Sequence, residues 1–207
     1  MNTRTPSDWA RILISCGVKP ATAAAWADAF AAEILPGTFS AGESELPSFL
    51  GQVLHESGML ERLEEGLYYK TPGRLMAIWP SRFKTLDDER PYLCNPEALA
   101  NKVYGGRMGN VNPGDGWRYR GGGLIQCTGS DNYRALQAAT GVHVHDQPEL
   151  LRRPGRDALR VTISWWEGNV PDSVMGNLVK VTKAVNGGTV GLDDRQRLTG
   201  LAVKAVA

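Results

Sequence analysis

Most of the chain has the spacing of hydrophobic residues that is typical of α-helices. The window 45–56 shows it best, because apolar residues recur there at the i, i+3, i+4, i+7 and i+8 positions that share one helix face. These residues are Leu46, Phe49, Leu50, Val53 and Leu54. A helix that begins near Pro47 and carries one apolar face is therefore predicted.

Start and stop signals predict most of the other helices. A residue that can cap a helix precedes a proline at Thr5-Pro6, Thr71-Pro72 and Asn95-Pro96. Further helices are predicted over 21–34, 130–140, 155–167, 175–185 and 193–205. Strand signals are confined to 60–69, which predicts a short irregular hairpin at most. The segment 86–123 is rich in Gly, Pro, Asn and Asp and predicts a long ordered loop, a kind that usually carries function.

Composition limits the classes of protein to consider. The chain has 207 residues, of which 42% are hydrophobic and 22% charged, so one globular domain over 1–207 is predicted. Residues 1–44 are expected to form helices packed on the remainder. The formal net charge of +1 argues against a dedicated nucleic-acid binder and leaves a neutral polymer such as a polysaccharide open.

The sequence carries no signal for membrane insertion or export. No apolar run approaches the roughly 18 residues of a membrane span, and residues 1–32 lack the basic head and apolar core of a signal peptide. The three cysteines, Cys16, Cys94 and Cys127, are odd in number and widely spaced, so reduced thiols are expected. Synthesis in a cytosol without stable membrane insertion is predicted.

Glu56 continues the apolar stripe of the helix predicted near Pro47, since it lies seven residues after Phe49 and three after Val53. Desolvation on such a stripe would favour the protonated carboxyl that a general acid needs. The alternative is that the helix frays at Ser57-Gly58 and leaves Glu56 as a solvated charge.

A second carboxylate, Glu65, follows nine residues after Glu56. Gly58 is a natural helix stop, so the chain can turn there and bring Glu65 across a cleft from Glu56. Two carboxylates, one at a helix end and one on a loop or hairpin, are the groups used in glycoside hydrolysis. Glu61 and Glu64 compete for the second role on spacing alone, and a charged exposed hairpin is the alternative for all three.

The sequence gives less support to a metal site, a phosphate-binding loop or a catalytic cysteine. His55-Glu56 begins an HExxH zinc motif, but Met59 stands where the second histidine would be, so no metal is predicted. The glycines at 121–123 lack the continuation of a phosphate-binding loop. A cysteine-dependent amidase would need a histidine beside Cys127, for which a small buried residue is the simpler interpretation.

Five segments resemble, in the same order, the motifs of family 19 glycoside hydrolases. They are HESGMLERLEEGLYY (55–69), AIWPSRF (77–83), NKVYGGRMGN (101–110), WRYRGGGLIQCTGSDNY (117–133) and VNGGTVGLDDR (185–195). The resemblance covers about residues 45–200 and is greatest to the branch of bacteriophage endolysins and bacterial lysozymes. It implies a mainly α, lysozyme-like fold with a small β-hairpin lobe by the active-site cleft. It also implies inverting hydrolysis of a β-1,4-linked amino-sugar polymer.

The resemblance implies roles for individual residues. Glu56 matches the general acid, Glu65 the general base, and Thr128 a residue that helps to hold the attacking water. Four residues match positions that bind the sugar: Gln126, Asn132, Tyr133 and Asn186. Arg195 matches an arginine near the catalytic carboxylates. Arg195 is expected to help keep Glu65 ionised, and the carboxyl groups should stand roughly 6.5–9.5 Å apart so that a water fits. No metal or organic cofactor is implied.

Two departures from the family pattern concern residues 121–127. The family usually reads GRG where this chain has Gly121-Gly122-Gly123, so an arginine contact is either absent or supplied by Arg120. Cys127 stands where Leu is common, which favours a packing role for this cysteine.

These observations predict a monomeric endolysin that cuts the glycan strands of bacterial peptidoglycan. A chitinase of the same fold is the nearest alternative, followed by a non-catalytic wall-binding module and a cysteine-dependent amidase. The protein is expected to be made in the host cytoplasm and to act in the periplasm at the cell wall. If it is phage-encoded, it would need a holin-type protein to reach the wall. No nucleic-acid partner is expected.

Overall fold

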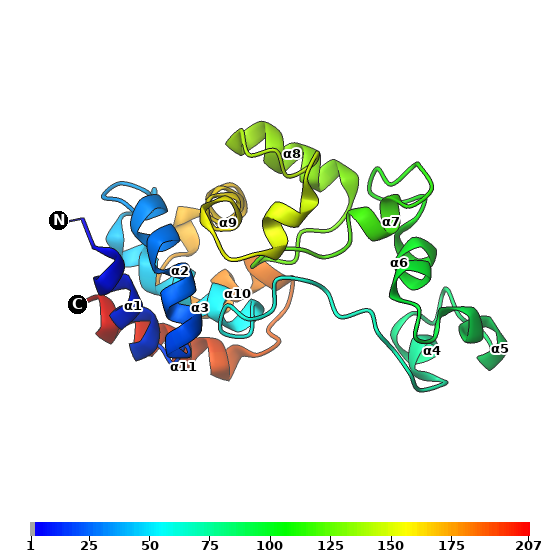
Figure 1. Ribbon diagram of the computed structural model, residues 1–207. Coiled ribbons are helices and arrows are strands. Elements are labelled where there is room, and N and C mark those ends of the chain that lie inside the picture. Colours follow the sequence, from blue (N-terminus) through cyan, green and yellow to red (C-terminus); the bar gives the residue numbers. More distant parts are fainter. Residues whose placement is uncertain (1–2) are drawn as a thin grey trace.

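A computed structural model describes residues 3–207, and its elements are almost entirely helical (Figure 1). The helices are α1 (Pro6–Ser15), α2 (Pro20–Glu33), α3 (Leu46–Glu56), α4 (Arg74–Ile78), α5 (Leu86–Glu89), α6 (Pro96–Tyr104), α7 (Asp115–Arg118), α8 (Ser130–Thr140), α9 (Arg156–Asn169), α10 (Leu178–Asn186) and α11 (Leu192–Val206). Short 3₁₀ turns are η1 (Glu43–Glu45), η2 (Arg90–Tyr92), η3 (Pro148–Arg152) and η4 (Asp172–Val174). The mainly helical class predicted from the sequence is confirmed.

Capping side chains begin two of the helices where the sequence predicts them. Thr5 Oγ1 accepts a hydrogen bond from Asp8 N (3.2 Å), and the Asp8 carboxylate accepts one from Thr5 N (2.9 Å), so that α1 begins with a capping box. Asn95 caps α6 by accepting a hydrogen bond from Ala98 N (3.2 Å). Local signals therefore place the start of both helices.

The helix after Thr71-Pro72 begins later than predicted, at Arg74. Its cap is not Thr71 but the fully buried carboxylate of Glu89, which accepts hydrogen bonds from Gly73 N and Met76 N (both 2.7 Å). Gly73 adopts the left-handed φ of 84° that this start requires. A contact between residues 16 positions apart thus overrides the local signal.

The β structure is smaller than a hairpin over 60–69. Glu64 forms a β-bridge with Gly122, and Gly122 forms a second with Cys127; these are the only β pairings in the described part of the chain. Within 60–69, Leu60 continues the turn after α3, and Glu64 pairs with a residue far along the chain. The predicted long loop over 86–123 is also wrong in part, because α5, α6 and α7 lie within it.

The largest hydrophobic core joins α1, α2, α3, α9, α10 and α11. Trp9, Trp26, Phe49, Trp166 and Leu198 are among its buried members. Helices α3 and α11 meet closely at Gly51, where an added Cβ would lie 2.0 Å from Thr199 Oγ1 and 2.9 Å from Thr199 N. This close approach brings the side chains of α11 next to the end of α3.

Two smaller cores lie on the other side of α3. Leu67, Leu75, Phe83, Leu99 and Val103 belong to the core of a small lobe built from α4 to α7, which extends away from the other helices in Figure 1. A further core lies beneath α8 and contains Tyr119, Tyr133, Leu136, Val144 and Leu151. The carboxylates predicted for chemistry lie where the chain passes from the main core to the small lobe.

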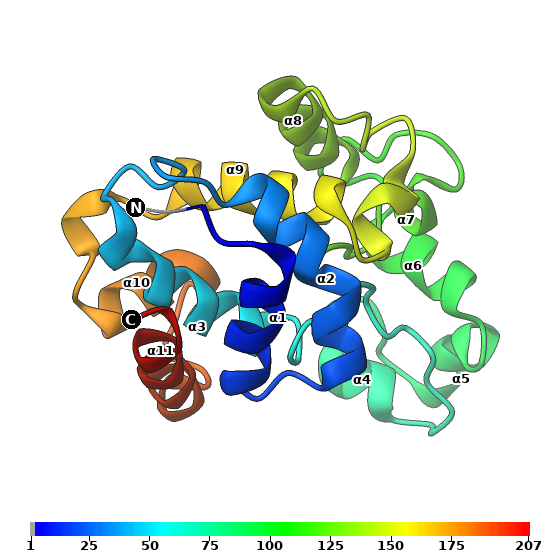
Figure 2. The ribbon, with the colours of Figure 1, turned by 60° about the vertical axis from the view of Figure 1, so that its left-hand side comes forward.

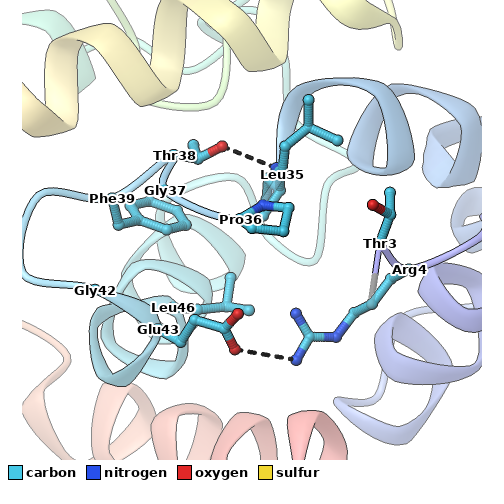
Figure 3. A pocket seen from close by; sticks show the side chains of 11 residues that line it. Thr3, Arg4, Leu35, Pro36, Gly37, Thr38, Phe39, Gly42, Glu43 and Leu46 are labelled. Carbon is cyan, nitrogen blue, oxygen red and sulfur yellow. Dashed lines mark hydrogen bonds and ion pairs between the residues drawn. The ribbon is translucent and has the colours of Figure 1, made fainter. Parts of the chain in front are cut away.

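A pocket of about 60 Å³ lies where the N-terminal segment meets the connection between α2 and α3 (Figure 3). Arg4 pairs with Glu43 across it (3.8 Å) and also donates a hydrogen bond to the carbonyl of Val206 (3.2 Å). These contacts fasten the start of the chain to α11. In residues 3–207 no helix is both long enough and apolar enough to cross a membrane.

Candidate active site

Glu56 is the last residue of α3, and its side chain is 26% exposed. Arg195 on α11 donates a hydrogen bond from Nη2 to Glu56 Oε1 (2.5 Å) and is itself only 2% exposed. The other guanidinium nitrogens donate to the side chain of Gln52 and to the carbonyl of Val190. Every nitrogen of this buried cation is thus satisfied, and the cation holds one oxygen of Glu56 in place.

The three residues His55, Glu56 and Ser57 each make a different fixed contact. His55 Nδ1 lies 2.7 Å from the Asp194 carboxylate on α11. Ser57 Oγ donates to the carbonyl of Val53 (2.7 Å) and accepts from Leu60 N (2.8 Å). His55 therefore joins the end of α3 to α11, and Ser57 begins the turn that follows α3.

That turn consists of three consecutive residues with left-handed backbone. Gly58, Met59 and Leu60 have φ values of 55°, 66° and 67°, a conformation that L-residues other than glycine rarely adopt. The Ser57 carbonyl, which accepts a hydrogen bond from Arg62 N (2.7 Å), helps to hold it. The chain reverses here, so Glu65 returns towards Glu56.

Glu65 has different partners from Glu56. Tyr104 on α6 donates its hydroxyl to Oε1 (2.5 Å), and Gly121 N donates to Oε2 (3.2 Å). Burial, together with the hydrogen bond to Glu65, raises the pKa of Tyr104 well above its usual value, so this phenol is a neutral donor. A side chain at 121 would press on Glu65, because its Cβ would lie 3.0 Å from the Cβ of Glu65.

The structure brings both carboxylates to one pocket of about 320 Å³, here called the carboxylate pocket. Its lining residues are His55, Glu56, Arg62, Glu64, Glu65, Gly66 and Gln126. Glu61 lies outside it and pairs with Lys19 (2.9 Å). Of the three glutamates that spacing left open, Glu61 is therefore separated from the site.

Glu64 also lines the carboxylate pocket, but its carboxylate is bound by another side chain. Arg120 Nε donates to Glu64 Oε1 (2.7 Å), and the Arg120 guanidinium also lies 3.5 Å from the centre of the Trp117 ring. Arg120 is thus held between Glu64 and Trp117. A side chain at Gly122 is excluded, because its Cβ would lie 2.5 Å from the Tyr133 hydroxyl.

Three of the other predicted residues line a neighbouring pocket of about 530 Å³, here called the Trp165 pocket. Gln126, Thr128 and Asn132 lie on one side of it, with Trp165 on α9 among the other lining residues. Thr128 Oγ1 donates to the carbonyl of Gln126 (3.1 Å), and Asn132 Nδ2 donates to the carbonyl of Thr128 (2.7 Å). Gln126 lines both pockets and has a left-handed φ of 53°. The two pockets therefore adjoin at this residue.

Two of the predicted contacts are corrected by the structure. Arg195 binds Glu56 and not Glu65, because the packing of α11 on α3 places it at the end of α3. Tyr133 is 0% exposed and donates its hydroxyl to the carbonyl of Arg120 (3.0 Å), so its side chain belongs to the core under α8 and does not face a sugar.

Asn186 lies in neither pocket. It ends α10, and its amide forms hydrogen bonds with Gly188 N (2.8 Å) and the Val190 carbonyl (3.3 Å). The same Val190 carbonyl accepts from Arg195 Nε (3.1 Å). In this structure Asn186 shapes the loop that holds Arg195.

Tyr104, Gly121 and Ser57 contact or position the carboxylates, and sequence reasoning did not assign them. Tyr104 lies within the NKVYGGRMGN segment, but a tyrosine 39 positions from Glu65 gives no local sign of the contact. Gly121 acts through its backbone N–H, and Ser57 acts through the turn. The order of the motifs was the one signal that could have drawn attention to these residues.

Cys127 is buried, and burial raises its pKa to about 12. Because the thiolate is the nucleophilic form of cysteine, a buried thiol of this kind is unsuited to nucleophilic catalysis. The geometry therefore disfavours a cysteine-dependent amidase.

The chain was compared with known proteins. No family model matches it. It is 37% identical over 153 residues to a glycosyl hydrolase family 19 domain-containing protein of Haemophilus influenzae, which covers 72% of this chain and 74% of the relative.

Solved structures with a similar fold are chitinases. A mutant of chitinase C superimposes with a TM-score of 0.61 at 16% identity, covering 96% of this chain and 75% of that one. Chitinase C from Streptomyces griseus superimposes with a TM-score of 0.56 at 16% identity, covering 99% of this chain and 94% of that one. A bacterial family 19 chitinase superimposes with a TM-score of 0.50 at 20% identity, covering 97% of this chain and 95% of that one. These similarities show the fold, and the Haemophilus relative shows that the chain belongs to the family 19 glycoside hydrolases.

Proposed function

We propose that this glycoside hydrolase is an endolysin-type lysozyme that cleaves the β-1,4 bonds of peptidoglycan glycan strands with inversion. The observation that carries the proposal is the carboxylate pocket, where Glu56 and Glu65 meet but are held by different groups. A buried cation holds Glu56, whereas a neutral phenol and a backbone N–H hold Glu65. Distinct surroundings separate the two carboxyl groups as an acid–base pair requires, and the match of Glu56 to the acid of the family motif decides which of them is the acid.

In this mechanism Glu56 donates its proton to the leaving glycosidic oxygen. Its Oε1 is held by Arg195, while Oε2 makes no hydrogen bond to residues 3–207 and is free to face a substrate. Arg195 is a positioning residue here, since it acts through Glu56.

Glu65 removes a proton from the attacking water in the same mechanism. Both of its oxygens accept hydrogen bonds, as an ionised carboxylate does, and each oxygen has lone-pair capacity left for a water. Thr128, beside Gln126, would share in holding that water. Sugars of the glycan would occupy the Trp165 pocket, where Gln126 and Asn132 present amides to them.

A chitinase is the second candidate, and the fold similarity to chitinases favours it. Turnover of purified murein sacculi against colloidal chitin separates the two. For the first candidate we further propose that the enzyme acts as a monomer at the cell wall, reached through a holin-type lesion if the gene is carried by a phage.

Replacing Glu56 with Gln tests the acid. Gln keeps the shape of the side chain but has no proton to donate, so hydrolysis of sacculi should fall by at least about a hundredfold. Circular dichroism should show that the fold is retained. Near-normal lysis by a folded Glu56→Gln protein would remove the proposed mechanism.

The base and the stereochemistry are tested together. Glu65→Gln should be severely impaired, whereas Glu61→Gln, which removes only an exposed pair with Lys19, should keep most of the activity. NMR of the first product should show the α-anomer, since water attacks opposite the leaving group. A β-anomer released first would indicate a retaining enzyme and would contradict the roles given to Glu65 and Thr128.

A further inference from the structure

A fourth pocket, of about 620 Å³, lies beside the carboxylate pocket and is here called the side pocket. It is formed by the beginning of α2, the segment 60–64 and the end of η3, and its lining includes Thr22, Arg152 and Pro154. Arg62 and Glu64 line both this pocket and the carboxylate pocket. A branch of a substrate bound at Glu56 and Glu65 could therefore enter it.

The charges of the side pocket are unbalanced. Its two acidic residues are already paired, Glu61 with Lys19 and Glu64 with Arg120. Its two arginines, Arg62 and Arg152, have no carboxylate within ion-pair distance among residues 3–207. The pocket thus offers two cations without acidic partners.

The two arginines differ in how they are held, since Arg62 is exposed and Arg152 is anchored by hydrogen bonds. Arg62 lies against the turn after α3, where a Cβ added to Gly58 would come within 2.8 Å of its Nε. Arg152 Nη2 donates to the carbonyl of Arg118 (2.7 Å), which anchors the guanidinium. Its Nε is buried and has no hydrogen-bond partner in the described chain. A buried Nε that lies against Gly122 is closed to a ligand, so Nη1, which donates no hydrogen bond within residues 3–207, is the donor that Arg152 offers to the pocket.

We propose that the side pocket binds a carboxylate carried by a branch of the glycan, with Arg62 and Arg152 as its partners. This inference rests on the proposed function, because a chitin chain has no carboxylate and peptidoglycan does. The carboxylate belongs either to the lactyl group on the sugar or to the peptide attached to that group. Arginine recognises carboxylates through paired N–H donors, and two guanidiniums suit either source.

Binding is tested first, because it requires no turnover. The arginine Nε–H signals of the protein are followed by NMR during titration with N-acetylmuramic acid, with the stem tripeptide L-Ala-γ-D-Glu-meso-diaminopimelate, and with uncharged N-acetylglucosamine. Saturable shifts of the Arg62 and Arg152 signals with either acid, and none with the uncharged sugar, are expected. The acid that produces them identifies the carboxylate, and no shift with either acid overturns the proposal.

Kinetics test the same point in the working enzyme. Arg62→Gln should lower kcat/KM on sacculi about tenfold more than on an N-acetylglucosamine oligomer, as expected for one charge-assisted contact. Arg153→Gln is the matched control, since Arg153 is exposed, lines neither pocket and carries the same charge. Equal losses on both substrates would overturn the proposal. A wild-type enzyme that cleaves only chitin would refute the peptidoglycan function, while the titration would still decide the anion site.

Discussion

At the scale of single residues, the two carboxylates show how neighbours differentiate identical side chains. Glu56 contacts a buried guanidinium, and Glu65 contacts a phenol and a backbone N–H. That both glutamates line one pocket was predictable from a helical stripe and from the order of motifs. Their partners were not, because Arg195 and Tyr104 are distant in sequence and nothing local indicates which carboxylate each would reach.

Tyr104→Phe tests the contact that sequence reasoning missed. The change removes the hydroxyl that donates to Glu65 Oε1 and leaves the ring to fill its place beside α6. Since the hydroxyl positions the proposed base, kcat should fall about tenfold, the loss expected for a hydrogen bond to a charged group. KM should change much less. Steady-state kinetics on sacculi provide the measurement, and an unaltered kcat would mean that Gly121 N–H alone suffices to hold Glu65.

At the scale of elements, contacts between helices decide what local signals leave open. The starts of α1 and α6 follow capping residues in the sequence. The start of α4 instead follows Glu89, and the path of 60–65 follows the left-handed turn after Ser57. Both depend on contacts that periodicity does not report.

Helices α2 and α9, which pack together (Figure 2), are also joined by an ion pair that makes stability depend on pH. Glu33 is 8% exposed and accepts hydrogen bonds from Arg156 Nε (2.9 Å) and Arg160 Nε (2.8 Å). Burial alone would raise the pKa of Glu33, but the hydrogen bonds and charges of Arg160 and Arg156 outweigh it and hold this pKa below its ordinary value of 4.5.

Glu33→Gln should therefore lower the free energy of unfolding at pH 7 by about 1–2 kcal/mol. A depressed native pKa stabilises the fold above the ordinary value of 4.5 and stops doing so as pH falls through the native value. Urea unfolding of variant and wild type should thus converge in acid. Glu61→Gln, an exposed pair, should have less than half the effect at pH 7, and a pH-independent difference would contradict the assignment to Glu33.

At the scale of the whole molecule, the proposed acid and the proposed base depend on different hydrophobic cores. Glu56 is held by helices of the main core, which has 27 buried members, whereas the Tyr104 that holds Glu65 belongs to the small lobe, whose core has six. Sequence analysis predicted one domain and did not separate these cores, since hydrophobic spacing shows that a residue is buried but not with which residues.

Activity should consequently be lost on heating before most of the helical structure melts. A core of six residues stabilises its lobe less than the main core does, so the small lobe should open first. Residual hydrolysis and far-UV circular dichroism, measured over the same temperatures, should give separate midpoints. Leu99→Ala in the small lobe, which costs about 2–5 kcal/mol locally, should widen the separation. Leu198→Ala in the main core should lower both midpoints, and coincident curves for all three proteins would show one cooperative unit.

The separate core of the small lobe has a consequence for how such enzymes diversify. The segments that join α4, α5 and α6 pack on that core, whereas the arginine that holds Glu56 lies on α11. Their length and composition can therefore change without altering the contact between Arg195 and Glu56. Selection for a new substrate can remodel the small lobe while the main core preserves this contact, so the length of polymer bound should evolve more readily than the type of bond that is broken.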